Sequence, residues 1–349
     1  MSRIALLTEC TPYNAKRTYR QHLDSIGGNT GNNAYLTALR DLYNAEYVNY
    51  GQLETTLEMD LYDTYIVGNL SWITENVALP EFYYSSFSKI KKKGKRFIPI
   101  SVGTQTADYK SDFTYHPQTI SFLQEIADQA IIACRGFYTA ELLRKNGIEN
   151  VEAIGCPSLY HRKDPDFKIT KKNKLNGKPI VATGITPWAN KNMDKTTILK
   201  FFDYALKNNM DFIEQARSNW FQFLFSNKKN NEKEKELERY LALKSKMFFN
   251  IDDWRAYVKT IDFSFSGRFH GNVIPLLEGV PALFISIDAR TREMCEFFEF
   301  PLVEINKMNF TMGINEFYEM TDYSQFNSKY KTLYSRFLDF SNRNGLVIS

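Results

Sequence analysis

Residues 261–281 read IDFSFSGRFHGNVIPLLEGVP, and this stretch decides the fold. The apolar run 261–265 predicts a strand, and residues 273–277 predict a helix that stops at the following Gly-Val-Pro. Arg268 and His270 therefore stand where a strand ends and a helix begins. In open α/β sheets, ligands bind outside the carboxyl ends of the strands, and a helix start offers unpaired N–H groups to an anion. We expect a phosphate or carboxylate site here, with His270 as its proton carrier; the alternative is that His270 only caps or packs.

Strand-like and helix-like runs alternate along the whole chain, which predicts an α/β fold with parallel sheets and helices on both faces. A chain of 349 residues is long enough for two domains, and the polar stretch 161–178 is typical of a linker. We therefore predict two Rossmann-like domains facing a cleft, the glycosyltransferase-B-like arrangement. An N-terminal, acceptor-side domain is expected over 1–165, a C-terminal, donor-side domain over 166–322, and a C-terminal helix that packs back on the first domain over 323–349. The predicted strands are Ile4–Thr8, Tyr47–Tyr50, Tyr65–Gly68, Phe97–Val102, Ala130–Ala133, Val151–Ile154, Ile180–Thr183, Phe212–Gln215, Met247–Asn250, Phe263–Ser266, Ala282–Ile287 and Leu302–Ile305.

The composition argues against several classes of function. The formal net charge is only +4, which does not favour nucleic acid as a partner. The four cysteines lack the close spacing of a metal knuckle, so we expect no metal and no cofactor, and thiols of this kind fit a reduced, cytoplasmic compartment. No apolar run approaches ~18 residues, and the first run is too short for a signal sequence.

Two segments are rich in charge. The run 89–96 holds six basic residues in eight, which indicates either a solvated helix end or attraction to an anionic membrane surface and a lipid-linked substrate. The segment 227–246 mixes both signs and predicts a solvent-facing helical hairpin.

Further arginines stand at strand ends. Arg290 and Arg292 follow the apolar run 282–287 and open a helix, where two guanidinium groups could grip a phosphate in fork geometry. The alternative is an arginine–carboxylate pair that holds two loops together. Arg135 also ends a strand and precedes a helix, so we expect its side chain to point into the same cleft. The alternative role for Arg135 is an interdomain salt bridge.

Uncharged polar groups gather at other turns. The Gly-rich stretch 27–34 opens a helix but lacks the Gly-x-Gly-x-x-Gly register, so it favours an acceptor-contacting loop or a structural turn over a dinucleotide site. The strand ends 101–105 and 155–158 carry hydroxyl, amide and thiol groups, which suit sugar hydroxyls or serve the fold alone.

Taken in order, these segments resemble the polysaccharide pyruvyl transferase family. The matching pieces are Gly28-Asn29-Thr30-Gly31-Asn32, Ser101-Val102-Gly103, Cys134-Arg135-Gly136 with Tyr138-Thr139-Ala140-Glu141-Leu142-Leu143, Gly155-Cys156-Pro157-Ser158, Gly267-Arg268-Phe269-His270-Gly271, Gly279-Val280-Pro281 and Asp288-Ala289-Arg290-Thr291-Arg292-Glu293. The chain departs from the family at Phe269, where leucine is common, and in the long segment between the first strand and the Asn-x-Gly-Asn motif.

The resemblance implies a metal-free enzyme that moves pyruvate from phosphoenolpyruvate onto a sugar diol of a cell-surface polysaccharide precursor, as a ketal. The expected partners are phosphoenolpyruvate and a lipid-linked glycan acceptor, with peripheral contact to the inner membrane surface and no nucleic acid. It implies catalytic roles for His270, Arg268 and Arg135. The expected donor-binding residues are Gly271, Asn272, Arg290, Arg292 and Phe269, and the expected acceptor-binding residues are Asn29, Thr30, Asn32, Thr104 and Gln105.

Two other functions stay open at this point. A nucleotide-sugar-dependent glycosyltransferase of the same architecture would need a ribose-binding carboxylate in the second domain, and Glu278 is the candidate. A non-catalytic sugar-binding or scaffold protein would release no phosphate with any acceptor.

Overall fold

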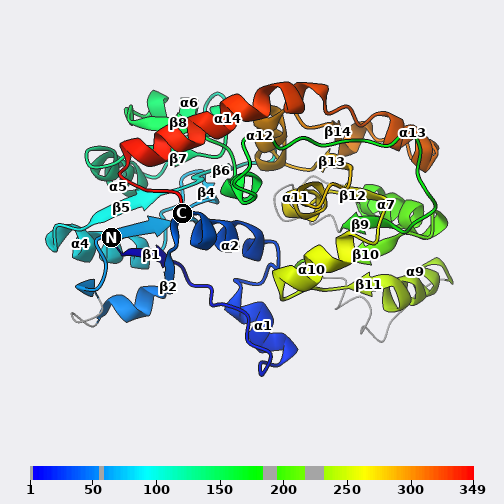
Figure 1. Cartoon of the computed structure of the whole chain (residues 1–349), viewed down its shortest axis with the longest axis horizontal. Coiled ribbons are helices and arrows are strands. Elements are labelled where there is room, and N and C mark those ends of the chain that lie inside the picture. The colour runs from blue at the N-terminus through cyan, green and yellow to red at the C-terminus, as the bar shows by residue number, and fades with distance from the viewer. Residues whose placement is uncertain (1–2, 55–58, 184–194, 217–231) are drawn as a thin grey trace.

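The computed structural model describes residues 3–54, 59–183, 195–216 and 232–349. The chain forms two α/β halves, each built around a parallel sheet, and the halves lie side by side (Figure 1). None of the described helices is long and apolar enough to cross a membrane.

The N-terminal half is built on a four-stranded sheet in the order β2-β1-β3-β5. A parallel pair, β7 and β8, extends this layer, because the backbone of Val102 bonds to Ala133 at 2.8 Å and receives a bond from Arg135 at 2.9 Å. All four residues of β1 are buried, as expected for a parallel strand covered on both faces. The strands are β1 (Ile4–Leu7), β2 (Glu46–Val48), β3 (Thr64–Val67), β5 (Arg96–Pro99), β7 (Ile132–Cys134) and β8 (Val151–Ala153), with β4 (Ile73–Thr74) and β6 (Thr104–Gln105) as a separate pair.

The helices of this half connect its strands. Local signals start several of them: Thr18 and Gln21 form a capping box, and Pro117 takes the first position of its helix. The helical segments are α1 (Tyr19–Ser25), α2 (Asn32–Tyr43), η1 (Tyr50–Glu54), α4 (Glu81–Lys92), α5 (Pro117–Ala127), α6 (Phe137–Lys145) and η2 (Pro157–Tyr160).

The C-terminal half has a six-stranded parallel sheet in the order β11-β10-β9-β12-β13-β14. Counted from β9, this is the Rossmann order 3-2-1-4-5-6, in which the strand order reverses between β9 and β12. The strands are β9 (Ile180–Thr183), β10 (Asp211–Ile213), β11 (Ser245–Lys246), β12 (Phe263–Ser266), β13 (Ala282–Ser286) and β14 (Leu302–Glu304). The helical segments are α7 (Lys195–Lys207), α9 (Glu232–Lys244), α10 (Ile251–Val258), α11 (Phe269–Leu277), α12 (Ala289–Phe298), η3 (Ile305–Lys307) and α13 (Ile314–Glu319).

The predicted strand Met247–Asn250 is wrong. The strand at this place is the two-residue β11, which ends before Met247. Phe248 instead stacks on Trp254 at 5.9 Å between ring centroids, and Asn250 caps α10. The predicted hairpin over 227–246 falls partly outside the described residues, and its described part is the single helix α9.

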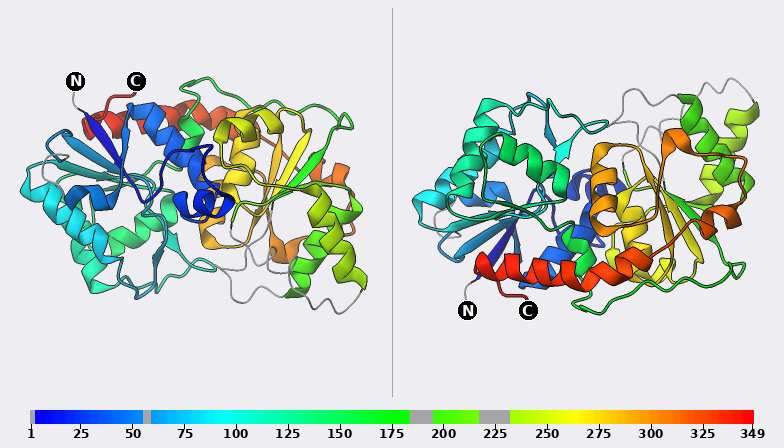
Figure 2. Two further views of the ribbon diagram at one scale, coloured as in Figure 1. Left: turned by 90° about the horizontal axis from the view of Figure 1, so that it is seen from below. Right: turned by 90° about the horizontal axis from the view of Figure 1, so that it is seen from above.

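The long helix α14 (Ser324–Arg343) runs along both halves (Figure 2). Its buried face recurs at helical spacing, and Phe337 stacks on Tyr160 of the N-terminal half at 4.3 Å. At its start, Phe326 packs on Phe300 of the C-terminal half at 5.0 Å. One hydrophobic core accordingly runs from the N-terminal sheet through α14 into α11 and α12, which holds the two halves together.

Candidate functional site

A pocket lies between the two halves, at the carboxyl ends of both sheets. The switch in strand order between β9 and β12 places the loop after β12 at its wall, where open α/β sheets bind ligands. Its lining comes from both halves and consists of Asn29, Asn32, Tyr35, Gly68, Ser71, Ser101, Arg135, Cys156, Gln215, Gly267, Arg268, Phe269, His270, Ile287, Arg290, Thr291 and Met294.

Arg135 enters the pocket from the end of β7 and is 2% exposed. Its Nη2 donates a hydrogen bond to the backbone oxygen of Ser71, and its Nε has no hydrogen-bond partner among the described residues. A Cβ at position 103 would lie 1.6 Å from this Nε, so Gly103 is needed for the guanidinium to fit. Burial, and then the charge of Arg290, lower the pKa of Arg135 to about 10.

Arg268 and Arg290 supply two more guanidinium groups from the starts of α11 and α12. Burial lowers the pKa of Arg268 to about 10, and its buried Nε lacks a hydrogen-bond partner within the described ranges. Arg290 lies 3.3 Å from the carboxylate of Asp288, which caps α12 through the amide of Thr291. Three partly or fully buried cations that repel one another make a pocket that attracts an anion.

His270 is the second residue of α11 and lies in the same pocket. Its Nε2 is 3.4 Å from the Sγ of Cys156, and its ring lies 5.7 Å from that of Tyr35. Burial, followed by the charges of Arg290 and Arg135, lowers the pKa of His270 to about 3. His270 is therefore neutral at pH 7 until a ligand adds negative charge beside it.

Cys156 comes from the N-terminal half and faces His270 across the boundary between the halves. Its Sγ is also 3.0 Å from the Oγ of Ser158, and burial raises the pKa of the thiol, which stays protonated at neutral pH. A protonated thiol can donate its weak hydrogen bond to the imidazole. The turn 155–158 thus faces the pocket through Cys156.

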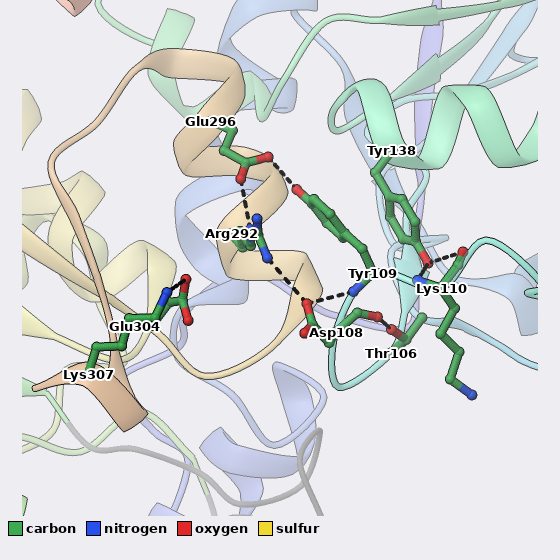
Figure 3. Close-up of polar contacts among 9 residues, drawn as sticks. All are labelled: Thr106, Asp108, Tyr109, Lys110, Tyr138, Arg292, Glu296, Glu304 and Lys307. Atoms are coloured by element: carbon green, nitrogen blue, oxygen red, sulfur yellow. Dashed lines mark hydrogen bonds and ion pairs between the residues drawn. The ribbon is translucent and has the colours of Figure 1, made fainter.

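Arg292, which the sequence predicts to bind the donor, does not line the pocket. Its side chain pairs with Asp108 at 3.3 Å and Glu296 at 2.8 Å, and lies 4.6 Å over the ring of Tyr109 (Figure 3). Tyr109 also donates to Glu296 at 2.6 Å. Arg292 therefore fastens a loop of the N-terminal half to α12, which is the alternative that the sequence left open.

Three other residues that the sequence predicts to bind substrate, Asn272, Thr104 and Gln105, do not line the pocket either. The fully buried side chain of Asn272 bonds to Ser264 and to the backbone oxygen of Leu283, both at 2.8 Å, and so ties α11 to its sheet. Thr104 is buried and shares a 2.6 Å hydrogen bond with Tyr115. Gln105 lies in β6 and does not line the pocket.

The other predicted residues reach the site in different ways. Phe269, Asn29 and Asn32 line the pocket. Thr30 lies just behind it, since its amide donates to the backbone oxygen of Gln215 at 2.6 Å. Gly271 is buried in the first turn of α11, where a side chain would collide with its neighbours.

Sequence reasoning missed two residues at the boundary between the halves. Gln215 lines the pocket although it lies outside the motifs, and its only signal was its position as the last residue of a predicted strand. Glu293 is 2% exposed and accepts hydrogen bonds from the amide and hydroxyl of Thr139, at 2.6 and 3.0 Å. This carboxyl of α12 therefore caps α6 of the opposite half. Burial, partly offset by Arg135, raises the pKa of Glu293 to about 7.

Glu278 does not serve the pocket. It lies at the end of α11, where its carboxylate pairs with Arg255 at 2.5 Å and with Lys259 at 3.3 Å. The ribose-binding carboxylate that a nucleotide-sugar transferase would need is therefore not supplied by this residue.

Comparisons with known proteins agree with this architecture. A proposed UDP-N-acetylglucosamine 2-epimerase from Listeria monocytogenes superposes with a TM-score of 0.50 at 9% identity, over 97% of this chain and 96% of that one. The S. aureus MnaA–UDP co-structure also superposes with a TM-score of 0.50 at 13% identity, over 99% of this chain and 98% of that one. These likenesses show the glycosyltransferase-B-like fold and no more. No curated protein matches the sequence.

The profile of the polysaccharide pyruvyl transferase family matches residues 9–289, which include all the residues that line the pocket except Arg290, Thr291 and Met294. The chain belongs to this family and is a transferase of polysaccharide pyruvylation.

Proposed function

We propose that this enzyme transfers pyruvate from phosphoenolpyruvate onto a sugar diol of a cell-surface polysaccharide precursor, forming a ketal. The observation that carries the proposal is the grouping of three guanidinium groups around one imidazole in a pocket between the halves: Arg135, Arg268, Arg290 and His270.

The charges of the pocket suit this donor. Phosphoenolpyruvate carries a carboxylate and a phosphate, up to three negative charges on a small molecule. Guanidinium groups bind both kinds of oxyanion through paired N–H donors. The buried Nε atoms of Arg135 and Arg268 add donors that the described protein atoms do not use. The first turn of α11 adds backbone N–H groups and its positive dipole end.

The reaction needs four balanced proton movements. A proton adds to the methylene carbon of the donor, and one sugar hydroxyl attacks the resulting oxocarbenium carbon and loses its proton. The bridging oxygen of the phosphate takes up a proton as the C–O bond breaks and phosphate leaves. The second hydroxyl then attacks the same carbon and loses its proton, which closes the ketal ring.

His270 is the group that we assign to these proton movements. Its pKa is low because burial and two nearby arginines disfavour the imidazolium. A bound trianion neutralises the three positive charges of the arginines and so raises that pKa. The donor thereby loads His270 with a proton, which His270 delivers to the methylene carbon; as imidazole it then accepts the proton of the attacking hydroxyl.

The lipid-linked acceptor and the cytoplasmic membrane surface belong to the same proposal. Their sequence support is the basic run 89–96, in which three of the six charges take part in ion pairs within the protein. These pairs are Lys91–Glu125 at 2.8 Å, Lys93–Asp60 at 3.3 Å and Lys95–Asp63 at 3.6 Å. We therefore expect weak, salt-sensitive sedimentation with anionic vesicles.

Calorimetry and a product assay test the donor assignment together. Phosphoenolpyruvate should bind the wild-type enzyme with net proton uptake at pH 7, measured as a dependence of the heat on the ionisation enthalpy of the buffer. Phosphate release with a panel of methyl pyranosides should accompany a 1-carboxyethylidene product, seen by mass spectrometry. Absence of donor binding, or phosphate release without that product, would refute the proposal.

A further inference from the structure

Two chemically different groups of side chains line the pocket. The first is the imidazole of His270 with the guanidinium groups of Arg135, Arg268 and Arg290. The second is a set of three primary amides: Asn29 and Asn32 from the N-terminal half, and Gln215 from the C-terminal half. Nothing in the sequence motifs or in the family resemblance assigns a role to Gln215.

The backbone around Gln215 is fixed by both halves. The carboxylate of Glu214 accepts from the amides of Gln215 and Ala216, at 2.9 and 3.0 Å, which turns the chain after β10. The backbone oxygen of Gln215 accepts from Thr30, and Ala216 forms an antiparallel bridge with Asn29. The loop that carries Asn29 is thus anchored directly to the residue that carries the third amide.

Two glycines, one from each half, make room for the side chain of Gln215. A Cβ at Gly31 would lie 2.7 Å from its Oε1, and a Cβ at Gly271 would lie 2.6 Å from its Nε2. The same point at Gly31 is 3.3 Å from the Cβ of His270. The amide therefore sits between the two glycine backbones, next to the imidazole.

This buried amide carries unused hydrogen-bonding capacity. Gln215 is 2% exposed, and its Nε2 has no hydrogen-bond partner in the part of the chain that the structure describes. Thr183 and Thr30, both fully buried, likewise have hydroxyls without a described partner. Burying a polar group without a partner costs about 1–3 kcal/mol, which a hydrogen bond to a ligand recovers.

We propose that Gln215, together with Asn29 and Asn32, forms the subsite for the hydroxyl-bearing sugar acceptor. An amide offers both donors and an acceptor, which matches a hydroxyl group that also donates and accepts. The anionic donor is matched by the arginines of the same pocket. This inference rests on the proposed function. It also means that the acceptor site is complete only when both halves contribute residues to it.

The test separates acceptor binding from donor binding. Gln215→Met keeps a similar shape and removes both hydrogen-bonding atoms, and Gln118→Met removes an exposed amide of α5, outside the pocket, as the control. With the most active methyl pyranoside of the panel, Gln215→Met should raise the acceptor KM about tenfold. The calorimetric Kd for phosphoenolpyruvate should change less than twofold, and Gln118→Met should leave both constants near wild type.

Each other outcome has a defined meaning. An unchanged acceptor KM, or a donor Kd that rises as much as the acceptor KM, would overturn the assignment of Gln215. If Gln215→Met does not fold, as judged by thermal melting, the isosteric Gln215→Glu replaces it with the same criteria for the acceptor KM. Failure of the wild-type enzyme to bind phosphoenolpyruvate, or to act on any sugar of the panel, would refute the proposed function instead.

Discussion

The two halves of the molecule present different chemistry to the same pocket. The C-terminal half contributes two guanidinium groups and an imidazole at two helix starts: Arg268, Arg290 and His270. The N-terminal half contributes mainly loops with uncharged groups, such as Asn29 and Ser101. A helix start holds an anion through fixed N–H groups, whereas loop amides and hydroxyls suit neutral sugars. The difference supports the proposed division between donor binding and acceptor binding.

Two residues cross this division. Arg135 brings a cation from the N-terminal half, and Gln215 brings an amide from the C-terminal half. Neither substrate subsite is therefore complete in one half alone. The carboxyl of Glu293 and the helix α14 hold the halves in contact, so the same packing that stabilises the fold also assembles the site.

Among substitutions in the pocket, loss of His270 should give the largest decrease in catalytic rate. His270→Ala removes the proposed proton carrier and should lower kcat by about 10²–10⁴-fold. Donor binding should persist, because the three arginines remain, but its net proton uptake should disappear. Steady-state kinetics and calorimetry in two buffers measure both quantities.

The comparison for His270 is His161, which lies outside the pocket and bonds to Asp41 at 2.8 Å. His161→Ala should leave kcat within about threefold of wild type. Near-full turnover in a folded His270→Ala enzyme would show that the proton carrier is another group.

Replacement of a pocket arginine by lysine should give the next largest effect on catalysis. Arg268→Lys keeps the charge but loses the paired N–H donors, and should lower kcat/KM for phosphoenolpyruvate about 10–100-fold, as expected for a lost charged hydrogen bond of about 1.5–3 kcal/mol. Arg292→Lys, outside the pocket, should change this constant by less than about threefold. Equal losses in both variants would contradict the division between Arg268 and Arg292.

Local pattern explains why some of these residues could be predicted. A strand that ends in a polar turn before a helix fixes both the backbone and its place at the sheet edge, so Arg268, His270 and Arg290 were found from sequence. The same reasoning could not show that Arg290 lines the pocket whereas Arg292 does not. Two residues turn a helix by about 200°, which puts Arg292 on the far side of α12.

Contacts between distant segments explain what the sequence did not predict. Gln215 lines the pocket because Gly31 and Gly271 approach it from opposite halves, and Thr104 lies outside the pocket, where its hydroxyl bonds to Tyr115. Such contacts depend on how the two sheets pack, and local periodicity does not encode them. A single buried strand, in contrast, is encoded locally: Phe263–Ser266 is confirmed residue for residue as β12.

Substitution of Cys156 should have a smaller effect on catalysis, and it tests the contact of Cys156 with His270 between the two halves. Cys156→Ala removes the partner 3.4 Å from the Nε2 of His270 and should lower kcat about threefold, since thiols are weak donors. The protonated thiol stabilises the neutral imidazole, so its loss should move the acidic limb of the pH–rate profile upward. Cys156→Ser should restore both, and Cys10→Ser, outside the pocket, should alter neither. A profile that stays unchanged in Cys156→Ala would contradict this positioning role.

The smallest effect concerns the pH dependence of the contact between the halves. The pKa of Glu293 is raised to about 7, so the folded protein holds this proton at pH values where the unfolded chain has lost it. Stability from this group is then fully present below about pH 4.5, where the unfolded chain is protonated as well, and is lost as the pH rises through 7. Glu293→Gln mimics the protonated carboxyl, and its melting temperature should fall less than that of wild type between pH 5 and pH 8.

Thermal melts of wild type, Glu293→Gln and Glu296→Gln across this range measure the difference. Glu296 lies on the same helix but in the exposed contact with Arg292, so its variant should follow the wild-type pH dependence. Parallel curves for wild type and Glu293→Gln would mean that the carboxyl is already ionised in the folded protein. In that case Glu293 would hold α6 as an anion beside Arg135, and the contact between the halves would not weaken as the pH rises toward 7.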